Sequence, residues 1–150
     1  MITGYSIEQV LPHRPPMILL DNFIEAGADY AICTLTITEQ SPFYDAASQT
    51  VPAYVGIEYM AQTIAAYAGA SNLAKGGAVK IGFLLGSRKY QPTVTVFKAG
   101  STLEISAQKL VMEKDQQQLP ALTQKHSFKI HCCIKKCLDL GHSIHFLWKV

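Results

Sequence analysis

A chain of 150 residues, 49% of them hydrophobic, can build one domain with a substantial core and is too short for two. The formal net charge of +2 excludes the strongly basic surface of a nucleic-acid-binding domain. We therefore expect a single domain over residues 1–150 with no nucleic-acid partner. The basic residues are scattered as on a solvated surface, which leaves a docking patch for a small acidic partner as the second interpretation: Arg14, Lys75, Lys80, Arg88, Lys89 and Lys98.

The first residues, Met1–Leu11, show no export signal, since they contain neither a basic segment nor a long apolar stretch. No segment reaches about 18 consecutive apolar residues, which argues against a membrane span. We therefore expect a cytoplasmic protein with reduced thiols and no membrane contact.

The N-terminal third predicts a short helix followed by a hairpin. Ser6–Leu11 is typical of a helix with Ser6 as its N-cap, and prolines follow to stop it. Pro16–Gly27 is a buried run, and Tyr30–Thr38 alternates in the manner of a half-buried strand, so the pair predicts a β-hairpin. Glu39–Thr50 is a loop by its Ser, Pro and Asp content.

The central segment Val51–Gly69, VPAYVGIEYMAQTIAAYAG, predicts a long helix. Pro52 suits the first helical turn, while Gly69 and then Lys75–Gly77 are expected to end the helix. Because the helix has almost no charged face, we expect other elements to wrap it. Glu58 is a carboxylate in this core-like setting, where a charge costs several kcal/mol unless it is paired, neutralised or used chemically.

Strand patterns dominate the remaining chain. Val79–Val94 and Ser101–Lys114 are strand candidates with a turn at Lys98–Gly100, and His126–Lys136 with His142–Val150 would complete a sheet. One long buried helix with five or six antiparallel strands predicts an α+β fold in which the sheet curls around the helix.

Residues 116–150 have an atypical composition, with four of the five histidines and three of the four cysteines. An altered chain end would explain this composition. The His and Cys spacing matches no common zinc site, and adjacent Cys132 and Cys133 would point to opposite faces of a strand, so we expect no metal. The residues concerned are His131, Cys132, Cys133, Cys137, His142 and His145.

Two motifs, LPHRPPMILLD at Leu11–Asp21 and the central-helix segment Val51–Gly69, resemble the signatures of hotdog-fold 3-hydroxyacyl-[acyl carrier protein] dehydratases. Within the helix, PAYVGIEYMAQ is most similar to a divergent, aryl-polyene-type branch. The resemblance covers roughly residues 5–115. It implies a hotdog fold, a homodimer or heterodimer with joined sheets and interfacial active sites, an acyl carrier protein or coenzyme A thioester as substrate, and no cofactor.

The resemblance also implies a reaction, the loss of water from a 3-hydroxyacyl thioester to give a trans-2-enoyl thioester. A histidine removes the proton beside the thioester carbonyl, a helix carboxylic acid helps to expel the 3-hydroxyl, and N–H groups at the helix start hold the enolate-like oxygen. The acid falls on Glu58, and Gln62 lies one turn further on, able to bond the carboxyl or the substrate. The N–H donor would be that of Ala53 or Tyr54.

The base is the departure from the family pattern. The family histidine, 14 residues before the acid, corresponds to Tyr44, and tyrosine with its ordinary pKa of about 10 is a poor base. Asp45 beside it could act as a base but is not what the family uses. His13 is the sole histidine before residue 126 and the leading candidate for the base; the alternative interpretation is that it orders the turn into the first strand.

Two further hypotheses stand beside a self-sufficient dehydratase. The chain could be a hotdog subunit that completes a heterodimer in which another chain supplies the missing histidine. It could also be an acyl-thioesterase, since related hotdog enzymes use a helix carboxylate to direct water at a thioester.

Overall fold

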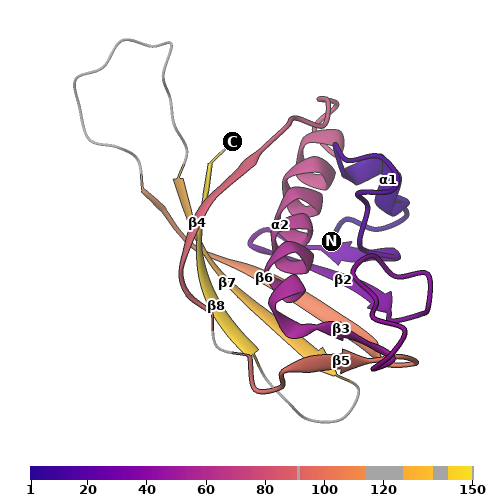
Figure 1. Ribbon diagram of the computed structural model, residues 1–150. Helices are drawn as coiled ribbons and strands as arrows, with labels where there is room; N and C mark the ends of the chain where they lie inside the picture. The colour runs from indigo at the N-terminus through magenta and orange to yellow at the C-terminus, as the bar shows by residue number, and fades with distance from the viewer. Residues whose placement is uncertain (91, 114–126, 137–141, 150) are drawn as a thin grey trace.

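The computed structural model places residues 1–90, 92–113, 127–136 and 142–149, and it describes the side chains of residues 1–82, 90 and 92–109 (Figure 1). A six-stranded antiparallel sheet curls around one long helix, α2, in the strand order β1-β2-β6-β7-β8-β4. The elements are α1 (Ile7–Val10), β1 (Asn22–Ala26), β2 (Tyr30–Thr36), β3 (Thr50–Pro52), η1 (Ala53–Val55), α2 (Gly56–Leu73), β4 (Phe83–Tyr90), β5 (Val96–Lys98), β6 (Thr102–Glu113), β7 (Ser127–Lys136) and β8 (His142–Lys149).

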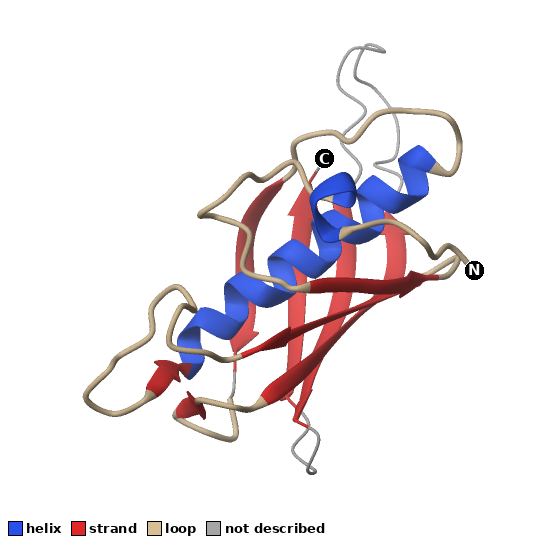
Figure 2. Ribbon diagram, turned by 90° about the vertical axis from the view of Figure 1, so that its right-hand side faces the viewer, coloured by secondary structure: helices blue, strands red, loops and turns tan. Residues whose placement is uncertain are grey.

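This arrangement confirms the predicted α+β hotdog fold. Figure 2 shows α2 packed against the sheet, and along the chain it lies between the β1–β2 hairpin and β4, the strand at the opposite edge of the sheet. The helix is wrapped as its lack of a charged face predicted, because most of its residues from Tyr59 to Ala66 are fully buried. The predicted single domain over residues 1–150 stays a prediction for the residues outside the ranges above.

The N-terminal elements also form as predicted. Ser6 caps α1 through a capping box with Gln9, each side chain bonding the backbone N–H of the other residue. Strands β1 and β2 pair as an antiparallel hairpin, and buried residues alternate along β2 with the period of two that its sequence shows.

The start of the central helix differs slightly from the prediction. Pro52 ends strand β3 and precedes a single 3₁₀ turn, η1, which leads into α2 at Gly56. The end lies beyond Gly69, where Gly76 has a φ of +74° and the N–H groups of Gly76 and Gly77 bond the carbonyls of Leu73 and Asn72. Gly76 and Gly77 therefore end the helix, as predicted for Lys75–Gly77.

The prediction that Gly69 helps to end the helix is wrong. Gly69 lies inside α2, and a Cβ atom there would be 1.9 Å from the carbonyl oxygen of Val10. Glycine is needed at this position because the end of α1 crosses the helix at backbone contact. This crossing fixes one end of the segment that leads from α1 to β1.

Two elements escaped the sequence analysis, the three-residue strands β3 and β5, which pair with each other next to the helix start. By contrast, the predicted C-terminal pair is confirmed, with β7 and β8 antiparallel inside the sheet. The C-terminal cysteines and histidines, at which we expect no metal, lie outside the described side chains. Among the side chains that are described, no group of three His, Cys, Asp or Glu residues could hold a metal ion.

The core lies between α2 and the concave face of the sheet, and its fully buried members include Leu11, Met60, Ile64, Leu103 and Ile105. Cys33 belongs to this core, and burial raises the pKa of its thiol to about 12 despite a hydrogen bond from Thr63. Within the described ranges, no helix is both long and apolar enough to cross a membrane. The cytoplasmic location stays a prediction.

Candidate active site

The carboxyl group of Glu58 lies in the first turn of α2 and is half-buried, not fully buried as its sequence setting suggested. Its Oε1 atom accepts a hydrogen bond of 3.0 Å from the Nε2 atom of Gln62, one turn further along the helix. Gln62 is completely buried, with an exposed fraction of 0%. The structure therefore brings together the two helix residues that the sequence placed on one face.

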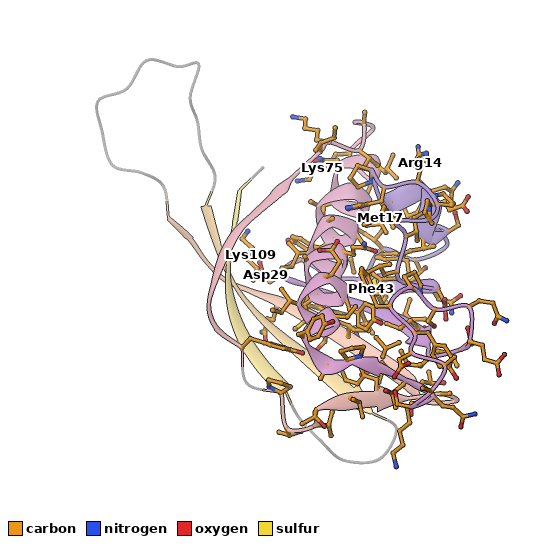
Figure 3. All side chains as sticks on the ribbon, viewed as in Figure 1. Arg14, Met17, Asp29, Phe43, Lys75 and Lys109 are labelled. Carbon is orange, nitrogen blue, oxygen red and sulfur yellow. The ribbon has the colours of Figure 1, made fainter. Side chains whose placement is uncertain are left out.

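The side chain of Gln62 also binds the segment between α1 and β1. Its Oε1 atom accepts the N–H of Leu19 at 2.9 Å, and its Nε2 atom donates to the carbonyl of Met17 at 2.8 Å. Figure 3 shows Met17 beside α2, where its own side chain is 51% exposed. The buried amide thus links the Glu58 carboxyl to a backbone segment more than forty residues earlier in the chain.

The two predicted oxyanion donors at the helix start are not equivalent. The N–H of Ala53 donates to the carbonyl of Thr95 at 2.9 Å, so it is unavailable to a ligand in this structure. The N–H of Tyr54 lies in the first turn, where no intrahelical acceptor exists, and its residue is 66% exposed. Of the two predicted donors, Tyr54 is the one that the geometry leaves open.

Tyr90 holds the same turn from the sheet side. Its hydroxyl donates to the carbonyl of Ala53, which also accepts the N–H of Gly56. Burial raises the pKa of Tyr90 to about 12, so the hydroxyl keeps its proton at physiological pH. The peptide between Ala53 and Tyr54 is therefore fixed by its carbonyl end, which directs the opposite N–H away from Tyr90.

The loop around Tyr44, at the position of the family's histidine segment, is held by hydrogen bonds between its own residues. Tyr44 is half-buried against the core, and its N–H donates to the carbonyl of Ser41. The carboxylate of Asp45 accepts from the Ser48 hydroxyl at 2.5 Å and from the N–H of Ala47 at 3.1 Å. These bonds, the Ser48 hydroxyl first, hold the pKa of Asp45 below its ordinary value, which makes it a poor base near neutral pH.

Among the described side chains, no hydrogen bond or ion pair joins His13 to Glu58 or Gln62. The segment passes Gly69 at Val10 and reaches Gln62 at Met17, so His13 lies on the stretch between those contacts. Glu58 lies a further turn beyond Gln62, about 16 Å along the axis from Gly69. The Nδ1 atom of His13 is buried without a hydrogen-bond partner, so it lacks the orienting acceptor that a histidine base ordinarily has.

A pocket of about 240 Å³ adjoins this region through Leu19 and Tyr59. Tyr59 is only 2% exposed, and burial, with smaller contributions from Asp21 and Tyr90, raises its pKa to about 12. Its hydroxyl is therefore a neutral hydrogen-bonding group and not a base. The pocket lining combines apolar and hydroxyl-bearing side chains: Ile18, Leu19, Asp21, Leu35, Thr36, Thr38, Gln40, Ser41, Pro42 and Tyr59.

The sequence pattern of the ApeP-like family, described as ApeP dehydratase, matches residues 5–122, well over half of the chain. The chain belongs to the ApeP-like dehydratase family. This family match and the structural similarity below confirm the resemblance to hotdog dehydratases of the divergent, aryl-polyene type.

Solved structures and curated relatives agree with this placement. The ApeP-like chain is similar to a chain of the dehydratase heterocomplex ApeI:P from Xenorhabdus doucetiae, with a TM-score of 0.82 and 25% identity, over 97% of this chain and 91% of that one. It is 33% identical over 75 residues to the 3-hydroxyacyl-[acyl-carrier-protein] dehydratase FabZ of Streptococcus sanguinis (strain SK36), which is 50% of this chain and 53% of the relative. The chain thus spans about half the length of the curated relatives it matches.

A third similarity concerns the fold alone. A hypothetical thioesterase protein with coenzyme A from Streptococcus pneumoniae TIGR4 has a TM-score of 0.58 and 9% identity, over 86% of this chain and 84% of that one. The hotdog fold is therefore shared with proteins of a different named chemistry.

Three contributors to the site were missed in the sequence. Tyr90, Thr95 and the backbone of Met17–Leu19 hold the helix start and the Glu58–Gln62 pair, and each does so from a distant part of the chain. Tyr90 carried no usable signal in a strand of mixed composition. The Met17–Leu19 contact was signalled only by the joint presence of the two family motifs.

Proposed function

We propose that this ApeP-like chain removes water from a 3-hydroxyacyl thioester to give a trans-2-enoyl thioester, with Glu58 as the general acid. The observation that carries the proposal is the bonded pair of Glu58 and Gln62 in the first turns of α2. A half-buried carboxyl with one oxygen held by a buried amide is a positioned group, and positioned acids contribute about 10²- to 10⁴-fold to rate.

The reaction balances with one base and one acid. The base takes the proton from C2, the C2–H electron pair forms the C2=C3 double bond, and the C3–O bond breaks. Glu58 gives its proton to the departing hydroxyl, which leaves as water, and the base later returns a proton to the carboxylate. The N–H of Tyr54 stabilises the negative charge that develops on the thioester oxygen.

We place the base on a second hotdog subunit. The loop at Tyr44 offers no histidine, Asp45 is committed to its own loop, and His13 has no orienting partner for Nδ1. The similarity to a chain of the ApeI:P heterocomplex supports a partnership of two unlike subunits. In this arrangement the chain supplies the acid and the oxyanion donor, and the partner supplies the histidine.

We further propose that the acyl chain is delivered on acyl carrier protein. The FabZ relatives are named as dehydratases of 3-hydroxyacyl groups on that carrier. A coenzyme A thioester is the alternative carrier, because both carriers present the same thioester to the acid and base.

The test is an assay of the purified chain, alone and with a histidine-bearing hotdog subunit, on 3-hydroxyacyl thioesters of both carriers. Formation of the enoyl thioester is followed by its ultraviolet absorbance, and free thiol is followed colorimetrically in the same samples. We expect enoyl product and no free thiol. Release of thiol without enoyl product would replace the proposal with thioester hydrolysis, and the absence of both products in every mixture would refute it.

A further inference from the structure

We propose that Gln62 is a positioning residue that places the acid proton of Glu58 on its outer oxygen, Oε2, and does not itself bind the substrate. This inference rests on the proposed function of Glu58 as the acid and deepens it. It replaces the role that the sequence alone suggested for Gln62, which included contact with the substrate.

The orientation of the Gln62 amide is determined by the backbone around it. The N–H of Leu19 requires an acceptor and meets Oε1 at 2.9 Å, while the carbonyl of Met17 requires a donor and meets Nε2 at 2.8 Å. Exchanging the amide oxygen and nitrogen would place donor against donor and acceptor against acceptor. The assignment of the two atoms is therefore unambiguous.

The remaining Nε2 proton is committed to Glu58. An amide NH₂ group has two protons and no acceptor capacity, and one of its protons goes to Met17. The other is directed at Oε1 of Glu58 at 3.0 Å. Both amide protons are used within the chain and Gln62 is 0% exposed, so no donor is left for a substrate.

The consequence for Glu58 follows from the same contact. Oε1 acts as the acceptor in both charge states of the carboxyl, because a carbonyl oxygen accepts better than a hydroxyl oxygen. In the protonated state the hydrogen is therefore on Oε2. Within the part of the chain whose side chains are described, no hydrogen bond reaches Oε2, and Glu58 is only half-buried.

This assignment supplies what a general acid needs. A carboxyl that shares its proton between two oxygens presents the wrong oxygen to the leaving group for part of the time. Gln62 removes this ambiguity and also holds the carboxyl rotamer, and it does so from a buried anchor bonded to two backbone groups. The acid is preorganised by its neighbour one turn along the helix.

The first test needs no turnover. In the wild-type chain, a side-chain amide proton resonance of Gln62 is expected to shift with pH, and this shift is expected to vanish in Glu58→Gln. Amide protons that do not respond to pH in the wild-type chain would overturn the proposal. This outcome is independent of whether the chain dehydrates any thioester.

The second test is kinetic and uses the assembly that is active in the thioester assay. Gln62→Met removes all three bonds, and Gln62→Glu keeps an acceptor for Leu19 while losing both donors. We expect kcat to fall about 10- to 100-fold in both, with KM within about twofold, because the acid is misplaced but binding is retained. In the Glu58→Gln background, Gln62→Met should cause no further loss of kcat.

Thr63→Val is the matched control, since Thr63 is equally buried and its hydroxyl donates to the Tyr59 carbonyl at 2.9 Å and not to Glu58. Its kcat should stay within about twofold of wild type. A raised KM with unchanged kcat in the Gln62 variants would restore the substrate-binding role and overturn the proposal. If the Gln62 variants do not fold, the amide titration of the wild-type chain decides, and an inactive wild type refutes the proposed function alone.

Discussion

The carboxylates of Glu58 and Asp45 lie in the two segments that the dehydratase resemblance assigns to one active site, and they are used in opposite ways. Glu58 is half-buried, with one oxygen held by the buried Gln62 amide and, among the described side chains, no hydrogen bond to the other. Asp45 has both oxygens bonded within its own loop, to the N–H of Ala47 and to the hydroxyl and N–H of Ser48. Under the proposed function the first arrangement positions a general acid, whereas the second uses a carboxylate to build a turn.

The loop that contains Asp45 has a specific backbone conformation, although it carries no histidine. Phe43 has a φ of +66° and Gln49 a φ of +55°, conformations that non-glycine residues adopt only when their surroundings enforce them. Phe43 nevertheless exposes 58% of its surface, on the same side of α2 as Met17 in Figure 3. The residue at the position of the family's acid is therefore held by a buried amide, while the segment at the position of the family's histidine uses its carboxylate to bond its own loop.

The largest expected effect comes from removing the acid. Glu58→Gln keeps an acceptor for Gln62, so we expect the fold to persist with a nearly unchanged Tm while kcat falls about 10²- to 10⁴-fold. Enoyl product formation in the active assembly measures the rate, and thermal unfolding measures the fold. Full activity in this variant would show that Glu58, like Asp45, is not needed for the reaction.

The next largest effect is expected on stability, at the crossing of α1 and α2 where Gly69 meets Val10. Gly69→Ala would place a Cβ atom 1.9 Å from the Val10 carbonyl oxygen, so either α1 or α2 must move. We expect a loss of about 3 kcal/mol of unfolding free energy, or about 6–12 °C in Tm. Asn72→Ala, in the same helix, is the control and should change stability by less than about 0.5 kcal/mol. Equal stability of the two variants would contradict the close crossing.

A smaller effect on kcat is expected from Tyr90, which holds the peptide of the proposed oxyanion donor Tyr54. Tyr90→Phe removes the donor to the Ala53 carbonyl, and Tyr67→Phe removes an analogous bond of 2.5 Å to the Ala28 carbonyl far from the site. Both should cost about 1 kcal/mol of stability. Only Tyr90→Phe should lower kcat, by about threefold to tenfold, which is less than the loss of an oxyanion donor itself. Matching kcat values in the two variants would show that Tyr90 has a structural role alone.

The smallest effect is expected in the Asp45 loop. Asp45→Asn should leave kcat within about twofold of wild type, and a loss as large as that of Glu58→Gln would make Asp45 the base. Because folding lowers the pKa of Asp45, its contribution to loop stability is complete above the ordinary value near 4 and is lost as pH falls through the lowered value. The protection of the Ala47 and Ser48 amides, relative to their intrinsic exchange rates at each pH, should therefore fall in acid in the wild type and much less in Asp45→Asn.

The sequence predicted the contact between Glu58 and Gln62 better than the contacts that hold Gln62 in place. Glu58 and Gln62 are four residues apart in a helix, so their contact follows from local periodicity. The bonds from Gln62 to Leu19 and Met17 span 43 and 45 residues, and no local pattern encodes them. Gly69 was misread as a helix end because the approach of Val10 is a tertiary contact.

The same reasoning explains two differences near the helix start. Strands β3 and β5 have three residues each, too few for an alternating pattern to be visible. Their pairing carries Thr95 to the Ala53 N–H, which removed one of the two predicted oxyanion donors.

A mixing experiment decides whether this chain supplies the acid while a second subunit supplies the base. Dehydration of a 3-hydroxyacyl thioester is measured for the chain alone, for a histidine-bearing hotdog subunit alone, and for their mixture, with His13→Asn and Glu58→Gln forms of this chain. We expect activity in the mixture to exceed the sum of the parts, to survive His13→Asn and to disappear with Glu58→Gln. Activity of the chain alone that is lost with His13→Asn would contradict the account.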